Sequence, residues 1–318
     1  MQNRVCAKFG IRYPIIQGGM AGFSKSGLVS AVSNAGGLGL LAGAMGPKAL
    51  RKEICKTREL TDKPFGVNIL LAMEHRAQAT LEAALEEGVR IFATTAGNPE
   101  KFTKILKDAD AVVMHVVPSV RHAVKAEAAG IDVIVAEGTE AGGLVGPLGV
   151  TTFVLVPQVV DAVKIPVVAA GGIGDARGLV AALALGAEGV QMGTRFLATR
   201  ECEIEDSLQE AIIKASDTST ELRGGGNLRW RAFTQDFLRS ALSESAMVSE
   251  AGDVESQLLD LLSEKDVERD IKAKGVYVGG QVAGLIREML SVEEAIRDII
   301  EGAAQVSERL GKSFPLLE

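Results

Sequence analysis

Two glycine loops are the residues of this chain best suited to bind a ligand. They consist of Ala170, Gly171 and Gly172 after one short apolar run, and of Met192, Gly193 and Thr194 after the next. Glycine lets backbone N–H groups approach the oxygens of a phosphate closely, because no side chain stands in the way. The pattern predicts a phosphate site, and the alternative is that these glycines only form tight turns.

The ends of the other apolar runs carry few groups that could act as acids, bases or nucleophiles. No lysine stands at such an end, which argues against Schiff-base chemistry and against pyridoxal phosphate. No two carboxylates or histidines fall together there, so we expect no metal site. A cofactor is therefore expected to bring the chemistry. The phosphate site by itself would fit a sugar phosphate or flavin mononucleotide (FMN).

Composition and charge narrow the class of protein. The 318 residues include 34 Lys and Arg against 41 Asp and Glu, and the net charge of −7 argues against nucleic acid as a partner. Cys6, Cys55 and Cys202 lie far apart without a CxxC pair, which is typical of a reducing compartment. The uncharged stretches 26–47 and 141–160 are broken by glycine and proline, and no secretory signal is visible. We expect a cytoplasmic protein that does not bind membranes.

Eight short apolar runs alternate with segments of helical spacing. Successive runs begin 20 to 34 residues apart and occupy residues 15–18, 38–43, 65–70, 91–96, 111–117, 133–138, 167–171 and 189–194. Apolar strands that alternate with helices indicate a parallel sheet buried on both faces. Eight such units predict an α/β fold, the (β/α)8 TIM barrel, whose active site lies at the carboxyl ends of the strands. An open doubly wound sheet is the alternative, but no GxGxxG follows a strand in the opening unit.

The helical segments and the last third of the chain complete the expected organisation. Val124 and Ala128 are expected on the buried face of one helix, and Val180 and Leu183 on that of another. We expect a barrel over residues 1–199, a small helical insertion or cap over 200–275, and a C-terminal loop and helix over 276–318 that return to the barrel.

Several stretches together resemble one family. They are YPIIQGGM (13–20), DKPFGVN (62–68), AEGTEAGG (136–143), PVVAAGGI (166–173), GVQMGTRF (189–196) and GGQVAG (279–284). This set resembles the nitronate monooxygenase (2-nitropropane dioxygenase) superfamily, and within it the chain is most similar to bacterial FMN-dependent enoyl-ACP reductases. The resemblance runs nearly end to end, and it implies a barrel that holds FMN.

Carried over position by position, the resemblance assigns roles to residues at the barrel mouth. Gly19 and Met20 would line the flavin ring, Asn68 would bond its polar edge, and Glu137 would lie near the ring or the ribityl chain. The phosphate loops would be those named above, from Ala170 to Gly172 and from Met192 to Thr194. Gln191 and Gln281 are further assignments to the cofactor site.

One position departs from the family pattern. The family normally places a histidine after Glu-Ala-Gly-Gly, where it transfers protons beside the flavin, whereas this chain has Leu144. An isobutyl group neither accepts nor donates a proton. His115, the only histidine on an expected strand, is a candidate to compensate for Leu144 if it points into the mouth, and the alternative is a packed core histidine.

These features favour an oxidoreductase that passes hydride from NADH or NADPH through FMN to a 2-enoyl thioester. The substrate would be carried on coenzyme A (CoA) or on acyl carrier protein, and we expect the enzyme to be a homodimer. The alternatives are a nitronate monooxygenase, a NAD(P)H:quinone-type reductase, and a weakly active flavin-binding protein.

Overall fold

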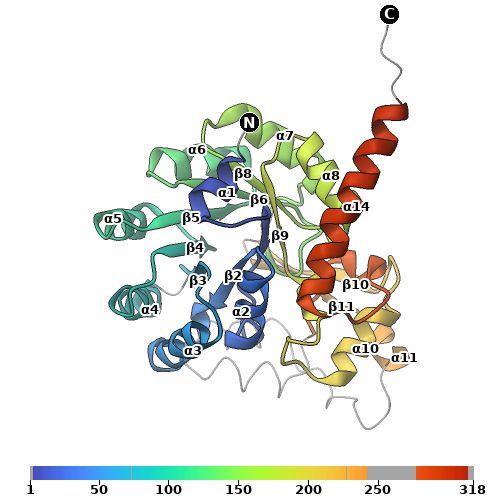
Figure 1. Cartoon of the computed structure of the whole chain (residues 1–318), viewed down its shortest axis with the longest axis horizontal. Helices are drawn as coiled ribbons and strands as arrows, with labels where there is room; N and C mark the ends of the chain where they lie inside the picture. The colour runs from blue at the N-terminus through green and yellow to red at the C-terminus, as the bar shows by residue number, and fades with distance from the viewer. Residues whose placement is uncertain (1–2, 73, 227, 242–276, 314–318) are drawn as a thin grey trace, which may run out of the picture.

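Eight parallel strands form a closed barrel. The computed structural model describes residues 3–72, 74–226, 228–241 and 277–313. The strand order is β1-β2-β3-β4-β5-β6-β8-β9, and β9 pairs with β1 to close the circle (Figure 1). These strands are β1 (Ile15–Gln17), β2 (Leu38–Ala42), β3 (Phe65–Leu70), β4 (Ile91–Thr95), β5 (Val112–Val117), β6 (Val133–Glu137), β8 (Val167–Ala170) and β9 (Gly189–Met192). Every predicted strand is present within two residues of its expected ends, so the TIM barrel is confirmed.

Helices follow the strands and surround the barrel. They are α2 (Ser26–Asn34), α3 (Pro47–Leu60), α4 (Glu74–Glu86), α5 (Glu100–Asp108), α6 (Val120–Ala128), α7 (Thr152–Ala162), α8 (Ala176–Ala184) and the short α9 (Thr194–Leu197). The long C-terminal helix α14 (Val292–Ser313) packs beside α8 and α2, which is the expected return of the tail to the barrel (Figure 1).

Alternate side chains of each strand fill the barrel interior. Ile16, Leu40 and Met114 are fully buried there in one apolar cluster. Helix α1 (Arg4–Phe9) adds Val5 and Phe9 to the same cluster, so this helix covers the amino-terminal end of the barrel. The opposite end, which holds the carboxyl ends of the strands, remains for a ligand.

The expected buried faces of two helices were wrong. Val124 of α6 and Leu183 of α8 are exposed. The sheet is contacted instead by Ala123 and Ala126, and by Leu179 and Ala182. Alanine-rich helices offer apolar residues on more than one face, so composition by itself did not fix the side that turns to the sheet.

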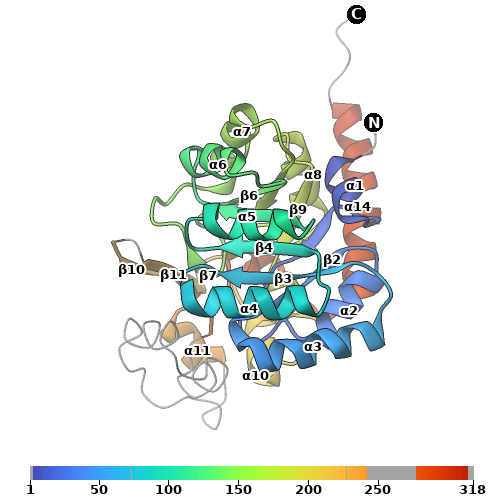
Figure 2. The ribbon, with the colours of Figure 1, turned by 90° about the vertical axis from the view of Figure 1, so that its left-hand side faces the viewer.

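The insertion after β9 is not wholly helical, which corrects the sequence prediction. Helices α10 (Asp206–Lys214) and α11 (Gln235–Ala241) flank a hairpin of β10 (Thr220–Gly225) and β11 (Leu228–Phe233). A third strand, β7 (Gly143–Val145), pairs with β11. This small sheet lies at the end of the barrel to which the strands point (Figure 2). Residues 242–275 of the expected insertion lie outside the described residues.

The sequence contains a signal for the hairpin, although a helical insertion was predicted over these residues. Apolar and polar residues alternate in LRWR (228–231), shortly after three glycines (224–226). Alternation with a period of two around a glycine turn is typical of a hairpin.

A helix that crosses a membrane must be long and apolar. Among the helices of the described residues, none is long and apolar enough to cross a membrane.

Candidate active site

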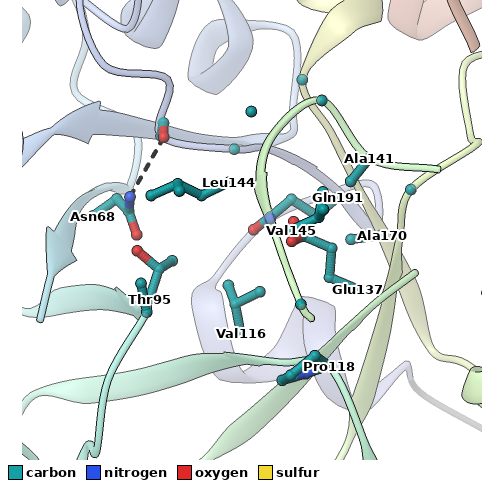
Figure 3. Close-up of a pocket in the computed structure, with 18 of the residues that line it drawn as sticks. Asn68, Thr95, Val116, Pro118, Glu137, Ala141, Leu144, Val145, Ala170 and Gln191 are labelled. Carbon is teal, nitrogen blue, oxygen red and sulfur yellow. Dashed lines mark hydrogen bonds between the residues drawn. The ribbon is translucent and has the colours of Figure 1, made fainter. Parts of the chain in front are cut away.

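A cavity of about 1020 Å³ opens at the carboxyl ends of the barrel strands. Most residues expected in the site line it: Gly19, Met20, Asn68, His115, Glu137, Leu144, Ala170, Gly171, Gly172, Gln191, Met192, Gly193 and Thr194. Figure 3 shows several of them around the cavity, from strands far apart in the sequence. Gln281 is the exception, since its side chain is exposed and does not line the cavity.

The two glycine loops lie side by side because β8 and β9 are neighbours in the barrel. Gly171 and Gly172 have φ of +93° and +73°, a conformation that side chains other than glycine rarely adopt. A Cβ at Gly193 would meet only Met20 within 4 Å, at 3.4 Å from its sulfur, so this backbone is open to a ligand.

The C-terminal loop contacts the glycine loop that follows β9. The backbone N–H of Gly280 donates to Oγ1 of Thr194 at 3.0 Å. This contact uses the threonine oxygen as an acceptor, so the threonine O–H is left to donate to a ligand. The neighbouring N–H of Gln281 donates to the carbonyl of Glu140 at 3.0 Å. Gln281 thus contributes its backbone to the loop rather than its side chain to the cavity.

Asn68 presents an unsatisfied acceptor at the end of β3. Its Nδ2 donates weakly to the carbonyl of Gly19 at 3.4 Å, while Oδ1 is buried and has no partner in the described part of the chain. A buried polar atom without a partner costs roughly 1–3 kcal/mol. A Cβ at Gly19 would come within 2.3 Å of Asn68 Cβ, so glycine is required for this approach. A bound group with an N–H donor would satisfy Oδ1, as a flavin ring would.

Glu137 ends β6 and turns its carboxyl group into the cavity near Gln191 (Figure 3). Burial raises the pKa of Glu137 to about 8, since no positive group lies close enough to stabilise the carboxylate. The carboxyl group is therefore protonated at neutral pH and can donate a hydrogen bond to a ligand oxygen.

Because Glu137 is protonated in the folded state, the stability of the FMN-free protein should depend on pH through this residue. The folded state binds a proton that the unfolded chain releases above its ordinary pKa of 4.5, so Glu137 lowers stability as pH rises from about 4.5 to 8. We expect Glu137→Gln to raise the free energy of unfolding relative to wild type at pH 8 more than at pH 5. One pKa unit corresponds to about 1.4 kcal/mol, so urea unfolding at both pH values can detect the change.

Glu59→Gln on the exposed surface of α3 is the matched control. This variant should leave the difference in the free energy of unfolding between pH 5 and pH 8 the same as in wild type. Equal pH dependence in wild type and Glu137→Gln would show that Glu137 is ionised across this range.

Leu144 lies at the centre of β7, opposite Trp230 of β11. Its half-buried side chain projects into the cavity (Figure 3). Residue 144 thus belongs to the small sheet that lies over the barrel mouth, whereas most other residues of the cavity lie at the carboxyl ends of the barrel strands. No proton can be exchanged at this position.

His115 does not replace the missing base. Its neighbours Met114 and Val116 face the barrel interior, so His115 faces the helix layer at the margin of the cavity. Its Nδ1 lies 2.8 Å from Oγ1 of Thr94. Burial lowers the pKa of His115 to about 4, so the ring is neutral and packed.

One acidic residue, Glu140, and one basic residue, Arg231, have structural roles near the mouth that the sequence did not reveal. The carboxylate of Glu140 accepts from the N–H of Thr152 at 2.9 Å, at the start of α7. The Nε of buried Arg231 donates to the carbonyl of Thr139 at 3.0 Å, which ties the hairpin to the loop after β6. Within the described ranges, no three His, Cys, Asp or Glu side chains are grouped to hold a metal ion.

Comparison with known proteins identifies the family. The model of the nitronate monooxygenase family matches residues 2–302. The FabK structure from Thermotoga maritima is 41% identical with a TM-score of 0.87, over 99% of this chain and all of that one. A curated relative from Rhodococcus jostii, (3aS,4S,5R,7aS)-5-hydroxy-7a-methyl-1-oxo-octahydro-1H-indene-4-carboxyl-CoA dehydrogenase, is 35% identical and covers 95% of this chain and 96% of its own length. A probable nitronate monooxygenase from Staphylococcus aureus is 38% identical over 69% of this chain and 74% of its own.

The closed barrel and the match to the family model identify a flavin-dependent oxidoreductase of the TIM-barrel class. The chain belongs to the nitronate monooxygenase family. Its similarity to FabK extends over nearly the whole length.

Proposed function

We propose that this enzyme uses FMN to reduce the double bond of a 2-enoyl thioester with hydride from NADH or NADPH. Bound FMN would supply the hydride relay. The observation that carries the proposal is that two adjacent glycine loops line the same cavity as Leu144, which stands where the family resemblance places a proton-transferring side chain. Hydride transfer needs no base at this position, and the proton that completes the reduction at the α-carbon would come from water or from another group, because Leu144 cannot donate one.

Different residues of the cavity would contact different parts of FMN and the substrate. The loops at Gly171 and Gly193 would hold the FMN phosphate, with Thr194 as an added O–H donor. Asn68 would accept a hydrogen bond from the flavin ring. Leu144 would form an apolar wall beside the reacting carbon atoms.

The thioester is supported by a relative rather than by a contact in the cavity. The Rhodococcus jostii dehydrogenase, whose name specifies a CoA thioester, is similar over nearly its full length. We propose that the acyl group of this protein's substrate is carried on CoA or on acyl carrier protein in the same way.

Oxidation of a nitronate is the second candidate, and it is favoured by the family match. A nitronate anion is already deprotonated, so this reaction also proceeds without a base at Leu144. A quinone reductase and a weakly active flavin protein are the remaining candidates. One experiment separates the four. The flavin is reduced anaerobically with NADH or NADPH and is then mixed with crotonyl-CoA, a quinone, a nitronate or oxygen. Fast reoxidation by crotonyl-CoA supports our proposal, and fast reoxidation by another acceptor alone replaces it.

Neutral nitroalkanes should be poor substrates of the wild-type protein. We expect any activity to be confined to the preformed nitronate, because neither Leu144 nor the packed His115 can remove a proton beside the flavin. Oxygen consumption with nitroethane and with ethyl nitronate, at equal concentration, measures the difference. Comparable rates would reveal another base, and His115→Ala would then test whether the ring moves into the mouth.

A further inference from the structure

The cavity extends beyond the cofactor cradle to a second group of cations. Arg229 of β11 and Lys125 of α6 both line it. Neither side chain makes an ion pair or a hydrogen bond within the residues that the structure describes, and Nε of Arg229 is buried without a partner there. Unpaired cations at a ligand cavity are notable in a chain with a net charge of −7.

The segment paired with Arg229 lies against the loop that leads into α6, the helix of Lys125. Arg229 is paired with Val145, directly before Gly146. A Cβ at Gly146 would lie 2.0 Å from Pro118 Cβ, so the β7 segment rests on the loop that leads into α6. Lys125, an exposed residue of α6, also lines the cavity.

The rim is separate from the loops assigned to the FMN phosphate. Lys125 follows β5 and the glycine loops follow β8 and β9, with β6 between them in the barrel. The cavity lining also includes polar side chains of α5 and α6. His122 is held by Ser119 through a contact of 2.7 Å between Nδ1 and Oγ, and Glu100 contributes one carboxylate. A cavity of about 1020 Å³ lies at the upper end of the size that one drug-sized ligand occupies, so there is space for a second ligand beside the cofactor.

We propose that Arg229 and Lys125 form a phosphate-binding rim for the second substrate of this enzyme. This inference rests on the proposed function, because both reactants named there carry phosphate far from their reacting atoms. A guanidinium group bonds two phosphate oxygens at once, and an ammonium adds a point charge. The phosphate is either that of the pantetheine arm and nucleotide of the thioester, or that of the pyridine nucleotide.

Equilibrium binding tests the rim without turnover. The FMN-loaded protein is titrated by calorimetry with CoA, pantetheine, NAD⁺ and NADP⁺. We expect Arg229→Gln to raise the Kd of a phosphate-bearing probe on the order of tenfold or more, and Lys125→Gln to raise it a few-fold, because charged hydrogen bonds are lost. Pantetheine, which has no phosphate, should bind equally to all variants.

The control variants carry the same change close by. Arg223→Gln lies on β10, where Arg223 pairs with Glu221, and Arg121→Gln lies on the exposed surface of α6. Neither residue lines the cavity, so both variants should bind every probe as wild type does. Lys125→Gln alters an exposed helix residue and keeps the test valid if the hairpin variant loses stability.

The pattern of loss identifies the ligand. Weakened CoA binding assigns the rim to the thioester, and weakened NAD⁺ and NADP⁺ binding assigns it to the nucleotide. Unchanged Kd values in the Arg229→Gln/Lys125→Gln double variant, or no binding of CoA or nucleotide to wild type, would overturn the proposal. Probe binding that depends on the rim, in an enzyme that does not reduce crotonyl-CoA, would overturn the proposed reaction and leave the rim intact.

Discussion

Leu144→His is expected to raise turnover of a neutral nitroalkane by roughly 10²–10⁴-fold, the usual contribution of general acid–base catalysis. The side chain of residue 144 projects into the cavity from β7, and the pairing of β7 with β11 fixes its position. An imidazole there can take the proton that Leu144 cannot. The rate with nitroethane under air, with FMN content measured in parallel, gives the result.

The same substitution should affect the proposed reaction, reduction of an enoyl thioester, in the opposite direction. A polar ring in an apolar wall costs free energy unless it finds a partner, so we expect slower reduction of the enoyl thioester. Leu148→His is the matched control, because Leu148 is exposed in the next loop and does not line the cavity. If Leu144→His leaves the rate unchanged for every substrate while FMN stays bound, residue 144 does not face the reacting atoms.

Gly193→Asp is expected to expel FMN from an otherwise folded protein. The position is open on the cavity side, so the new carboxylate would lie close to the cofactor phosphate. Two like charges about 4 Å apart repel by about 4 kcal/mol near a protein surface, which corresponds to roughly a thousandfold weaker binding. The absorbance ratio of flavin to protein after purification, and an FMN titration of the apoprotein, measure the loss.

The choice of glycine matters for this test. Gly171 has a positive φ, and a Cβ there would lie 2.9 Å from the carbonyl oxygen of Gly138, so its replacement would also disturb folding. Gly193 is therefore the test position. Gly225→Asp is the control, because that glycine in the hairpin has no atom within 4 Å of its Cβ position. Full FMN occupancy in Gly193→Asp would remove the loop after β9 from the phosphate site.

Local sequence was sufficient to predict the barrel. Each strand is a short apolar run that ends in small or polar residues, and the repeat of strand and helix permits few topologies. The glycine loops were predicted together because the carboxyl ends of parallel strands meet at one end of a barrel. The structure brings Gly171 and Gly193 to one cavity by this rule, although 22 residues separate them.

The local sequence did not show which way the side chain of His115 points. Strand β5 is apolar on both faces, since Val113 and Val117 contact the helices while Met114 faces the barrel interior. No alternation of polar and apolar residues therefore showed whether His115 points inward. Tertiary packing decided that it points to the helix layer and bonds Thr94.

The cover of the mouth depends on contacts between segments far apart in the sequence. By itself, the sequence determined the barrel, the cofactor loops and the absence of a base at residue 144. Only the tertiary structure decided that β7 joins β11, that Leu144 is thereby held over the cavity, and that Arg229 and Lys125 share its rim. A three-residue strand such as β7 has almost no stability or pattern of its own, and it forms because the β11 backbone satisfies its hydrogen bonds.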